Sequence, residues 1–190
     1  MMKHPRILAF SGSLRAASYN QKLATIAANA ARDAGADVTL ISLRDFRMPL
    51  FDEDLETEAG MPEAAQKLKA LFASHDGLII ASPEYNSTIT AALKNAIDWV
   101  SRATSPDEKP LLVLSGKKAA ILSASPGGYG GARSLVQLRP FLENIHVTVI
   151  PEQVSVAKAY EAFSEDGLLI DPVQSAAIKD MAVKLVASFV

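Results

Sequence analysis

Short apolar runs alternate with longer amphipathic stretches along nearly the whole chain, and this alternation restricts the fold more than any other feature. Five runs are interpreted as strands: residues 6–10, 38–43, 77–81, 119–124 and 145–150. Apolar side chains recur at helical spacing in the stretches predicted as helices: residues 20–34, 62–74, 89–102, 132–143 and 172–189. Strands that alternate with helices build a parallel sheet. The sequence therefore predicts an α/β fold, a three-layer doubly wound domain with a five-stranded parallel sheet.

Several segments are predicted to be irregular or to lack a chemical role. Residues 111–114 are apolar but are interpreted as a loop or short helix, and residues 44–60 as a long acidic loop. Within the latter, the acidic residues from Asp52 to Glu56 are expected to be solvated rather than to bind a metal. The three histidines lack metal-ligand spacing and are expected at the surface or at strand ends: His4, His75 and His146. We therefore predict no metal site.

Length and charge set further bounds. A chain of 190 residues that is 49% hydrophobic is predicted to form one folded domain over residues 1–190. Its net charge of −2 argues against a nucleic acid or an anionic membrane as the main partner. The N-terminal apolar run, residues 7–10, is too short for a signal peptide, and no longer run suits a membrane span. We expect a soluble, cytoplasmic protein.

The chain contains no cysteine. This excludes disulfides, thiolate zinc sites, iron–sulfur clusters and a catalytic thiol. Ser82 and Ser125 lack the Gly-x-Ser-x-Gly context of a hydrolase nucleophile, and Trp99 is interpreted as a packing or subunit-contact residue. Any redox chemistry would therefore require a bound cofactor.

Ligands of doubly wound sheets bind outside the carboxyl ends of the strands, so the loops that follow the strands are the candidate sites. The first loop supplies three hydroxyls, a guanidinium and an amide, from Ser11, Ser13, Ser18, Arg15 and Asn20. Because this loop leads into a helix N-terminus, it is predicted to bind a phosphate group. The alternative is a polar turn in which Ser18 or Asn20 is only the helix N-cap.

The next two strand ends also carry candidate ligand loops. The loop after residues 77–81 has the composition expected beside a flat heteroaromatic ring, with Pro83, Glu84, Tyr85, Asn86 and Ser87. Its alternative is a turn in which residues 86–88 cap the following helix. The loop after residues 119–124 is rich in glycine and begins with Ser125, Pro126, Gly127 and Gly128. It is suited to close backbone approach, and a merely flexible turn is the alternative.

Two common nucleotide-binding motifs are absent. The glycine loop has Arg133 where the third glycine of a Rossmann fingerprint belongs, and it follows the wrong strand. A P-loop is also excluded, because Leu111 stands where its first glycine is required and Lys118 where serine or threonine is required. The cofactor is therefore expected to be neither a Rossmann-bound dinucleotide nor a P-loop triphosphate.

Taken together, these motifs resemble the NADPH-dependent FMN reductase family, in particular bacterial quinone and chromate reductases of flavodoxin-like fold. The resemblance is carried by Gly12-Ser13-Leu14-Arg15 with Ser18 and Asn20, Met48-Pro49-Leu50-Phe51 with Asp54-Leu55-Glu56, Pro83-Glu84-Tyr85-Asn86, Leu93-Lys94-Asn95-Ala96-Ile97-Asp98-Trp99, Gly130-Gly131-Ala132-Arg133, and Ala162-Phe163 with Asp166-Gly167 and Leu169. It implies a non-covalently bound FMN, reduced by NADPH or NADH. The first loop would bind the FMN phosphate, and the second and third loops would flank the isoalloxazine. The stretch from Pro126 to Tyr129 varies in the family, so acceptor preference does not carry over from it.

The expected activity is transfer of a hydride from NAD(P)H through bound FMN to quinones or similar small acceptors. No side chain is assigned a catalytic role, because the flavin carries the chemistry. Two alternatives remain open: a flavin reductase that uses FMN as a diffusible substrate, and a flavodoxin-like electron carrier. A flavin-dependent sensor that acts through a partner contact is a third. The resemblance further implies a homodimer or homotetramer.

Overall fold

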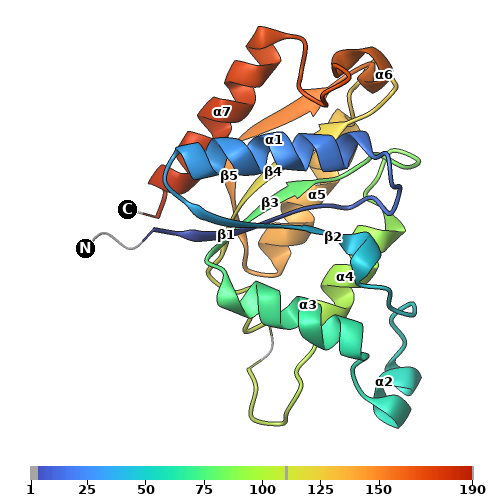
Figure 1. The fold of residues 1–190 in the computed structure, drawn as a ribbon. Coiled ribbons are helices and arrows are strands. Elements are labelled where there is room, and N and C mark those ends of the chain that lie inside the picture. The colour runs from blue at the N-terminus through green and yellow to red at the C-terminus, as the bar shows by residue number, and fades with distance from the viewer. Residues whose placement is uncertain (1–3, 110, 190) are drawn as a thin grey trace.

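The centre of the molecule is a five-stranded sheet of order β2-β1-β3-β4-β5, in which every neighbouring pair is parallel (Figure 1). The computed structural model describes residues 4–109 and 111–189. Its strands are β1 (Arg6–Ser11), β2 (Asp37–Ser42), β3 (Gly77–Ala81), β4 (Lys118–Ala124) and β5 (Thr148–Val156). From β1 the chain adds β2 on one side of the sheet and then β3, β4 and β5 on the other. The predicted doubly wound parallel sheet is confirmed, and its strand order reverses between β1 and β3.

Helices cover both faces of the sheet and complete the three layers. One face packs against α1 (Tyr19–Asp33) and α7 (Pro172–Ala187), which lie together on one side of the sheet in Figure 1. The other face packs against α3 (Glu63–Ser74), α4 (Ala91–Val100) and α5 (Ala132–Asn144). Each interface buries an apolar cluster that shares no residue with the other. The strands are therefore apolar on both faces, as parallel strands between helical layers must be.

Helix α1 shows how the sequence determines one of these elements. Ser18 is its N-cap, and the hydroxyl accepts a hydrogen bond from the backbone N–H of Gln21. Small side chains form its buried stripe, among them Ala24, Ala27 and Ala31, each fully buried. Because these side chains are short, the helix axis approaches the sheet closely. The N-terminus of α1 is thereby fixed beside the end of β1.

The predicted start of α4 was wrong by two residues. The cap is Thr90 rather than a residue of the segment 86–88, and its Oγ1 accepts from the Leu93 N–H at 3.1 Å. The same hydroxyl donates to the Gly12 carbonyl at 2.6 Å. Thr90 therefore anchors the first loop to α4, while Asn86 and Ser87 adopt positive φ angles of 52° and 66° in a turn before the helix.

The predicted limits of β5 were also wrong. Residues 145–147 belong to the turn after α5, where His146 has a φ of 65°, and the strand begins only at Thr148. It then continues past Pro151, with a register shift opposite Ala119 and Ile121. An edge strand tolerates proline at such an irregularity, because the missing N–H leaves no interior ladder bond unmade.

The acidic segment 44–60 is not one continuous loop. It contains the 3₁₀ helix η1 (Leu43–Asp45) at its start and helix α2 (Glu53–Ala59), with Asp52 as the N-cap of α2. Carboxylates in a first helical turn interact favourably with the helix dipole, which explains why this acidic run is helical. A further short helix, α6 (Ala159–Ala162), was not predicted. Residues 111–114 form turns, as expected.

Trp99 is a packing residue, as predicted: it is fully buried, and its indole N–H donates to the Pro49 carbonyl. His75 precedes β3 but is buried, and its Nε2 lies 2.8 Å from Thr39 Oγ1. His4 and His146 are exposed. Within residues 4–109 and 111–189, no three His, Asp or Glu side chains are grouped so as to hold a metal ion. No helix in the same residues is long and apolar enough to cross a membrane.

Candidate functional site

The loops that follow β1, β3 and β4 meet at one cleft. Of the residues predicted for the site, the cleft is lined by Ser13, Arg15, Ser18, Asn20, Pro83, Glu84, Tyr85, Ser125 and Pro126. The other predicted residues lie in the same loops but outside its lining: Ser11, Asn86, Ser87, Gly127 and Gly128. Tyr19 and Ala124 also line the cleft, although neither was predicted as a site residue. The topology therefore brings the three candidate loops together as predicted.

Serine hydroxyls shape the first loop. Ser11 Oγ accepts from the Ser13 N–H at 3.1 Å, and Ser13 Oγ accepts from the Arg15 N–H at 3.2 Å. These bonds fold the loop back so that the N-terminus of α1 borders the cleft. Within the described residues, no hydrogen bond uses the backbone N–H of Tyr19 or Asn20, the first two residues of the helix. Free N–H groups at a helix N-terminus form a suitable cradle for an anion.

Arg15 adds a positive charge to this cradle. Its guanidinium carbon lies 5.9 Å from the centroid of the Tyr19 ring, and no ion pair of Arg15 occurs among the described residues. Tyr19 in turn stacks on Phe163, with centroids 5.8 Å apart and planes 10° apart. This aromatic support restricts the guanidinium without neutralising it. The charge is therefore available to an anionic ligand.

Asn20 holds two walls of the cleft together. Its Nδ2 donates to the Ala124 carbonyl at 2.7 Å, and its Oδ1 accepts from the Ala124 N–H at 2.8 Å. The side chain is buried and joins α1 to the end of β4. Because both ends of the amide are already bonded to the protein, the side chain of Asn20 contributes to the site by positioning it. Its backbone N–H remains available.

The second loop is a tight turn. Tyr85 and Thr88 exchange backbone hydrogen bonds of 3.1 Å in both directions around Asn86 and Ser87. The positive φ angles of those two central residues are typical of a two-residue hairpin turn. Tyr85 lines the cleft and is 49% exposed, so its ring is accessible at the cleft mouth.

Glu84 is bonded to α5 rather than directed at open space in the cleft. Its side chain is only 7% exposed, and Oε1 accepts from Arg133 Nη2 at 2.6 Å and from Arg133 Nε at 2.8 Å. The other oxygen accepts from the Ser134 N–H at 3.3 Å. One helical turn further on, Gln137 contacts Thr88 Oγ1 at 2.7 Å. Helix α5 therefore fixes the second loop, and Glu84 acts as a positioning residue.

The glycine loop contacts the same helix. The guanidinium carbon of Arg133 lies 4.9 Å from the centroid of the Tyr129 ring, so this arginine joins the second loop to the third. Gly131, the N-cap of α5, packs directly over Ser123 of β4. Arg133 stands in one of the motifs that carry the family resemblance, but its role and that of Gln137 were not predicted, because their partners lie 49 residues away in the chain and no local pattern marks such pairs. The spacing between the two loops is set by this end of α5.

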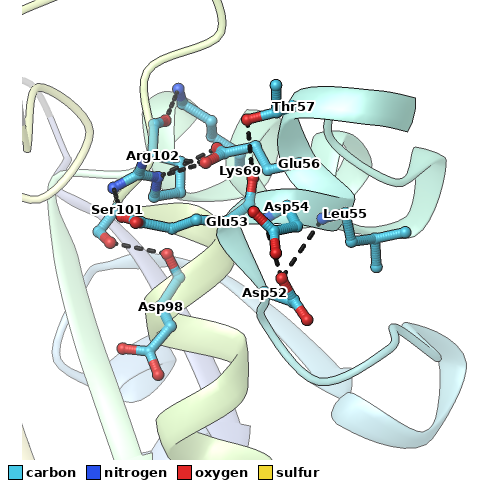
Figure 2. Close-up of polar contacts among 10 residues, drawn as sticks. All are labelled: Asp52, Glu53, Asp54, Leu55, Glu56, Thr57, Lys69, Asp98, Ser101 and Arg102. Carbon is cyan, nitrogen blue, oxygen red and sulfur yellow. Dashed lines mark hydrogen bonds and ion pairs between the residues drawn. The ribbon is translucent and has the colours of Figure 1, made fainter.

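A larger groove of about 1020 Å³ lies between α2, α3 and the segment after α4, and it shares no lining residue with the strand-end cleft. Its basic side chains are paired with acids, as Figure 2 shows for Arg102 and Glu56. Lys69 bonds to Glu108 Oε1 and to the Arg102 carbonyl. The guanidinium carbon of Arg102 also lies over Phe51, 5.1 Å from the centroid of its ring. These contacts fasten the groove walls to each other and leave no unpaired cation for a ligand.

The buried pair in this groove predicts a pH dependence of stability. The Lys69 ammonium and the Thr104 N–H hold the pKa of Glu108 down to about 2. A carboxyl with a lowered folded-state pKa stabilises the fold above its unfolded pKa of about 4.3, and this contribution is lost as the pH falls towards 2.

We expect Glu108→Gln to reduce the free energy of unfolding at pH 7 by about 1–3 kcal/mol, with a difference from wild type that shrinks between pH 5 and pH 2.5. Denaturant unfolding at a series of pH values measures this. Glu165→Gln, at an exposed residue without an ion pair among the described residues, is the matched control. A Glu108→Gln deficit that stays constant down to pH 2.5 would contradict the assignment.

Comparison with known proteins adds to this geometry. Residues 5–161 match the family model described as NADPH-dependent FMN reductase. An NAD(P)H-dependent FMN reductase of Pseudomonas aeruginosa is 38% identical over 168 residues, which cover 87% of this chain and 85% of that protein. A quinone reductase of Escherichia coli K12 is 36% identical over 142 residues, covering 75% of this chain and 71% of that protein.

A solved structure shows the same arrangement of elements. The flavoenzyme NAD(P)H:(acceptor) oxidoreductase FerB of Paracoccus denitrificans superposes with a TM-score of 0.76 at 26% sequence identity. The match covers 97% of this chain and 98% of that chain. The family match over residues 5–161 includes all three loops of the cleft, and the structural match extends over most of the chain.

Proposed function

The chain belongs to the NADPH-dependent FMN reductase family, and we propose that it binds FMN in the strand-end cleft and passes electrons from NAD(P)H to a quinone or similar small acceptor. Its fold is flavodoxin-like and its activity is that of an oxidoreductase. The observation that carries the choice of site is the meeting of three loops, one of which combines free helix N–H groups with an unpaired arginine.

The donors of the first loop suit the phosphate of FMN. Ser13, Arg15, Ser18, Tyr19 and Asn20 all line one small cleft, and within the described residues the N–H groups of Tyr19 and Asn20 make no hydrogen bond. A phosphate dianion there would accept charge-assisted hydrogen bonds and lie at the positive end of the α1 dipole. This donor set supports binding of the phosphate by the first loop.

The two remaining loops suit the flavin ring. Pro83 and Tyr85 of the second loop and Ser125 and Pro126 of the third loop all line the cleft, and the proline and tyrosine rings offer flat apolar surface. The backbone N–H of Gly128 makes no hydrogen bond within the described part of the chain, so it can donate to a polar edge of the ring. Helix α5 would hold both loops at a fixed spacing through Arg133.

Bound FMN would supply the redox chemistry, namely hydride transfer from the nicotinamide and electron transfer to the acceptor. The residues of the chain bind and orient the reactants. The one acidic residue of the cleft lining, Glu84, is already bonded to Arg133, and the sequence contains no thiol. In the proposed reaction the lining residues therefore bind and orient the cofactor, and no side chain of the cleft is assigned a catalytic role.

We further propose that the enzyme is cytoplasmic and forms a homodimer or homotetramer. Residues 1–190 would form a single FMN-binding domain in each subunit. The support is the resemblance to the family, together with a net charge of −2 that suits small acceptors better than nucleic acid.

We expect the purified protein to show the absorption bands of oxidised flavin and to lose them on anaerobic titration with NADPH. Added quinone should restore the bands and sustain steady-state NADPH oxidation. Bleaching without steady turnover would instead indicate a flavodoxin-like carrier. Protein that purifies without flavin yet consumes added FMN as a substrate would indicate a flavin reductase with diffusible FMN. The first result would overturn the proposed turnover, and the second would overturn the proposed prosthetic role of FMN.

A further inference from the structure

A second pocket lies beside the first loop and contains two arginines that form no ion pair with any described residue. It has a volume of about 380 Å³ and is lined by Arg44 and Arg47 together with apolar side chains, including Leu14, Phe46 and Met48. None of its lining residues is acidic. The pocket adjoins the flavin cleft, because Leu14 lies between two cleft residues in the sequence.

The charge state of these arginines distinguishes the pocket from other basic positions. In the described residues, neither Arg44 nor Arg47 forms an ion pair or lies over an aromatic ring. By contrast, Arg102 is paired with Glu56 in the larger groove. Two unpaired guanidinium groups at one pocket favour an anion with several oxygens, and a phosphate monoester is the biological group that best fits such a fork.

The apolar lining indicates what is attached to that phosphate. Phe46 and Met48 are half-buried and Leu14 is 55% exposed, so the pocket offers a surface on which a flat heterocycle can lie. A ligand that places a heterocycle and a phosphate here, and that also reaches the neighbouring flavin cleft, must be an extended nucleotide. NADPH has this form, because its adenosine 2′-phosphate lies at the end of the molecule opposite the nicotinamide.

We propose that Arg44 and Arg47 bind the adenosine 2′-phosphate of NADPH and make the enzyme prefer NADPH to NADH. This inference rests on the proposed function, because it assigns the donor end of the same reaction. Asp45 lies between the two arginines in the sequence, but it is not a lining residue of the pocket and forms no ion pair with either arginine within the described residues.

The first test is binding to the wild-type protein, measured by calorimetry without any nicotinamide. Adenosine 2′,5′-bisphosphate should bind at least about tenfold more tightly than 5′-AMP, the gain expected for one charge-assisted contact. Comparison with ADP distinguishes the 2′-phosphate from a pyrophosphate bound at the same arginines. Equal affinity for the bisphosphate and 5′-AMP, or tighter binding of ADP, would overturn the assignment.

The second test is the variant with both Arg44→Gln and Arg47→Gln. Its KM for NADPH should rise by about tenfold or more, while its KM for NADH, its kcat and its FMN affinity stay close to wild type. The double variant Lys109→Gln with Lys179→Gln removes the same two positive charges from exposed positions and is the control for net charge. Unchanged donor preference in the double variant would overturn the proposal, as would an equal loss with both donors.

The two proposals fail in different ways. If the flavin-loaded wild type oxidises neither nicotinamide, the proposed function is wrong, and the calorimetric comparison still decides whether the pocket binds a 2′-phosphate. If both donors are oxidised with equal KM, the enzyme is a reductase without this specificity site. Circular dichroism of the double variant separates loss of fold from loss of the subsite, and the wild-type comparison requires no variant.

Discussion

Replacement of Gly131 by alanine is expected to lower the free energy of unfolding by about 3 kcal/mol or more, the sum of a strained backbone and an overpacked core. The loss is a large part of the total stability of a typical domain. Gly131 has a φ of +85°, in the left-handed region that residues with a Cβ adopt at a cost. A Cβ there would lie 1.8 Å from Ser123 Oγ and 2.6 Å from Ser123 Cβ.

Neither partner in this contact can move freely. Ser123 is fully buried in β4, between the neighbouring strands β3 and β5, and Gly131 begins α5. Relief of the clash must therefore displace the first turn of α5. That turn carries the Ser134 N–H and the Arg133 side chain that hold Glu84. We expect Gly131→Ala to weaken FMN binding as well as stability.

Gly128→Ala is the matched control. It lies three residues earlier in the same loop, has no positive φ, and a Cβ there would meet no atom within 4 Å. Its unfolding free energy should stay within about 0.5 kcal/mol of wild type.

A double-mutant cycle separates the two causes of the Gly131→Ala loss. Ser123→Gly combined with Gly131→Ala should recover the part of the lost unfolding free energy that comes from the steric clash, and leave the part that comes from the strained backbone. Chemical denaturation of the four variants provides the measurements, and wild-type stability of Gly131→Ala would contradict the packing.

The sequence was sufficient to predict the sheet and the place of the cleft. Continuous apolar runs such as Gly77–Ala81 can be buried only between two helical layers, and the carboxyl ends of parallel strands necessarily share one edge. The cap of α1 was also predictable, because Ser18 acts on a backbone N–H three residues away. Interactions between residues that are close in the chain can therefore be predicted from the local sequence pattern.

The roles of several polar residues could not be predicted in the same way. Glu84 and Asn20 stand in motifs that suggest cofactor contact, but their side chains are bonded to Arg133 and to the backbone of Ala124. These partners lie 49 and 104 residues away in the chain. A polar side chain beside a ligand looks the same in sequence whether it faces the ligand or supports the wall behind it. Only the tertiary structure separates binding residues from positioning residues.

The element boundaries that were wrong have a related cause. Helix α2 was read as loop because its acidic composition suggested solvation, although Asp52 caps it and Glu56 pairs with Arg102. The start of β5 was placed too early because residues 145–147 are as apolar as the strand itself. At β5 a backbone turn decided the outcome, and composition carried no information about it. At α2 the acidic first turn itself favours a helix, and the Asp52 cap and the pairing of Glu56 with Arg102 stabilise it further.

Arg15→Ala is expected to weaken FMN binding by about ten- to a hundredfold, the range for loss of a hydrogen bond to a charged group. The substitution removes only the side chain's contacts. The loop hydrogen bond to Ser13 Oγ comes from the backbone N–H of Arg15, so alanine retains this bond and only the guanidinium over Tyr19 is lost. The fold should therefore be unaffected, because Arg15 is exposed and makes no ion pair within the described residues.

Riboflavin, which lacks the phosphate, provides the decisive comparison. If Arg15 binds the phosphate, Arg15→Ala should leave the affinity for riboflavin close to that of wild type while the affinity for FMN falls. Flavin fluorescence titration of the apoprotein measures both, and Arg15→Lys should retain part of the FMN affinity because it keeps the charge without the fork. The wild-type preference for FMN should also weaken at high salt, since exposed charges are screened. Purified Arg15→Ala protein that keeps stoichiometric flavin after dilution would show that the phosphate is held elsewhere, and an equal loss of riboflavin would place Arg15 beside the ring instead.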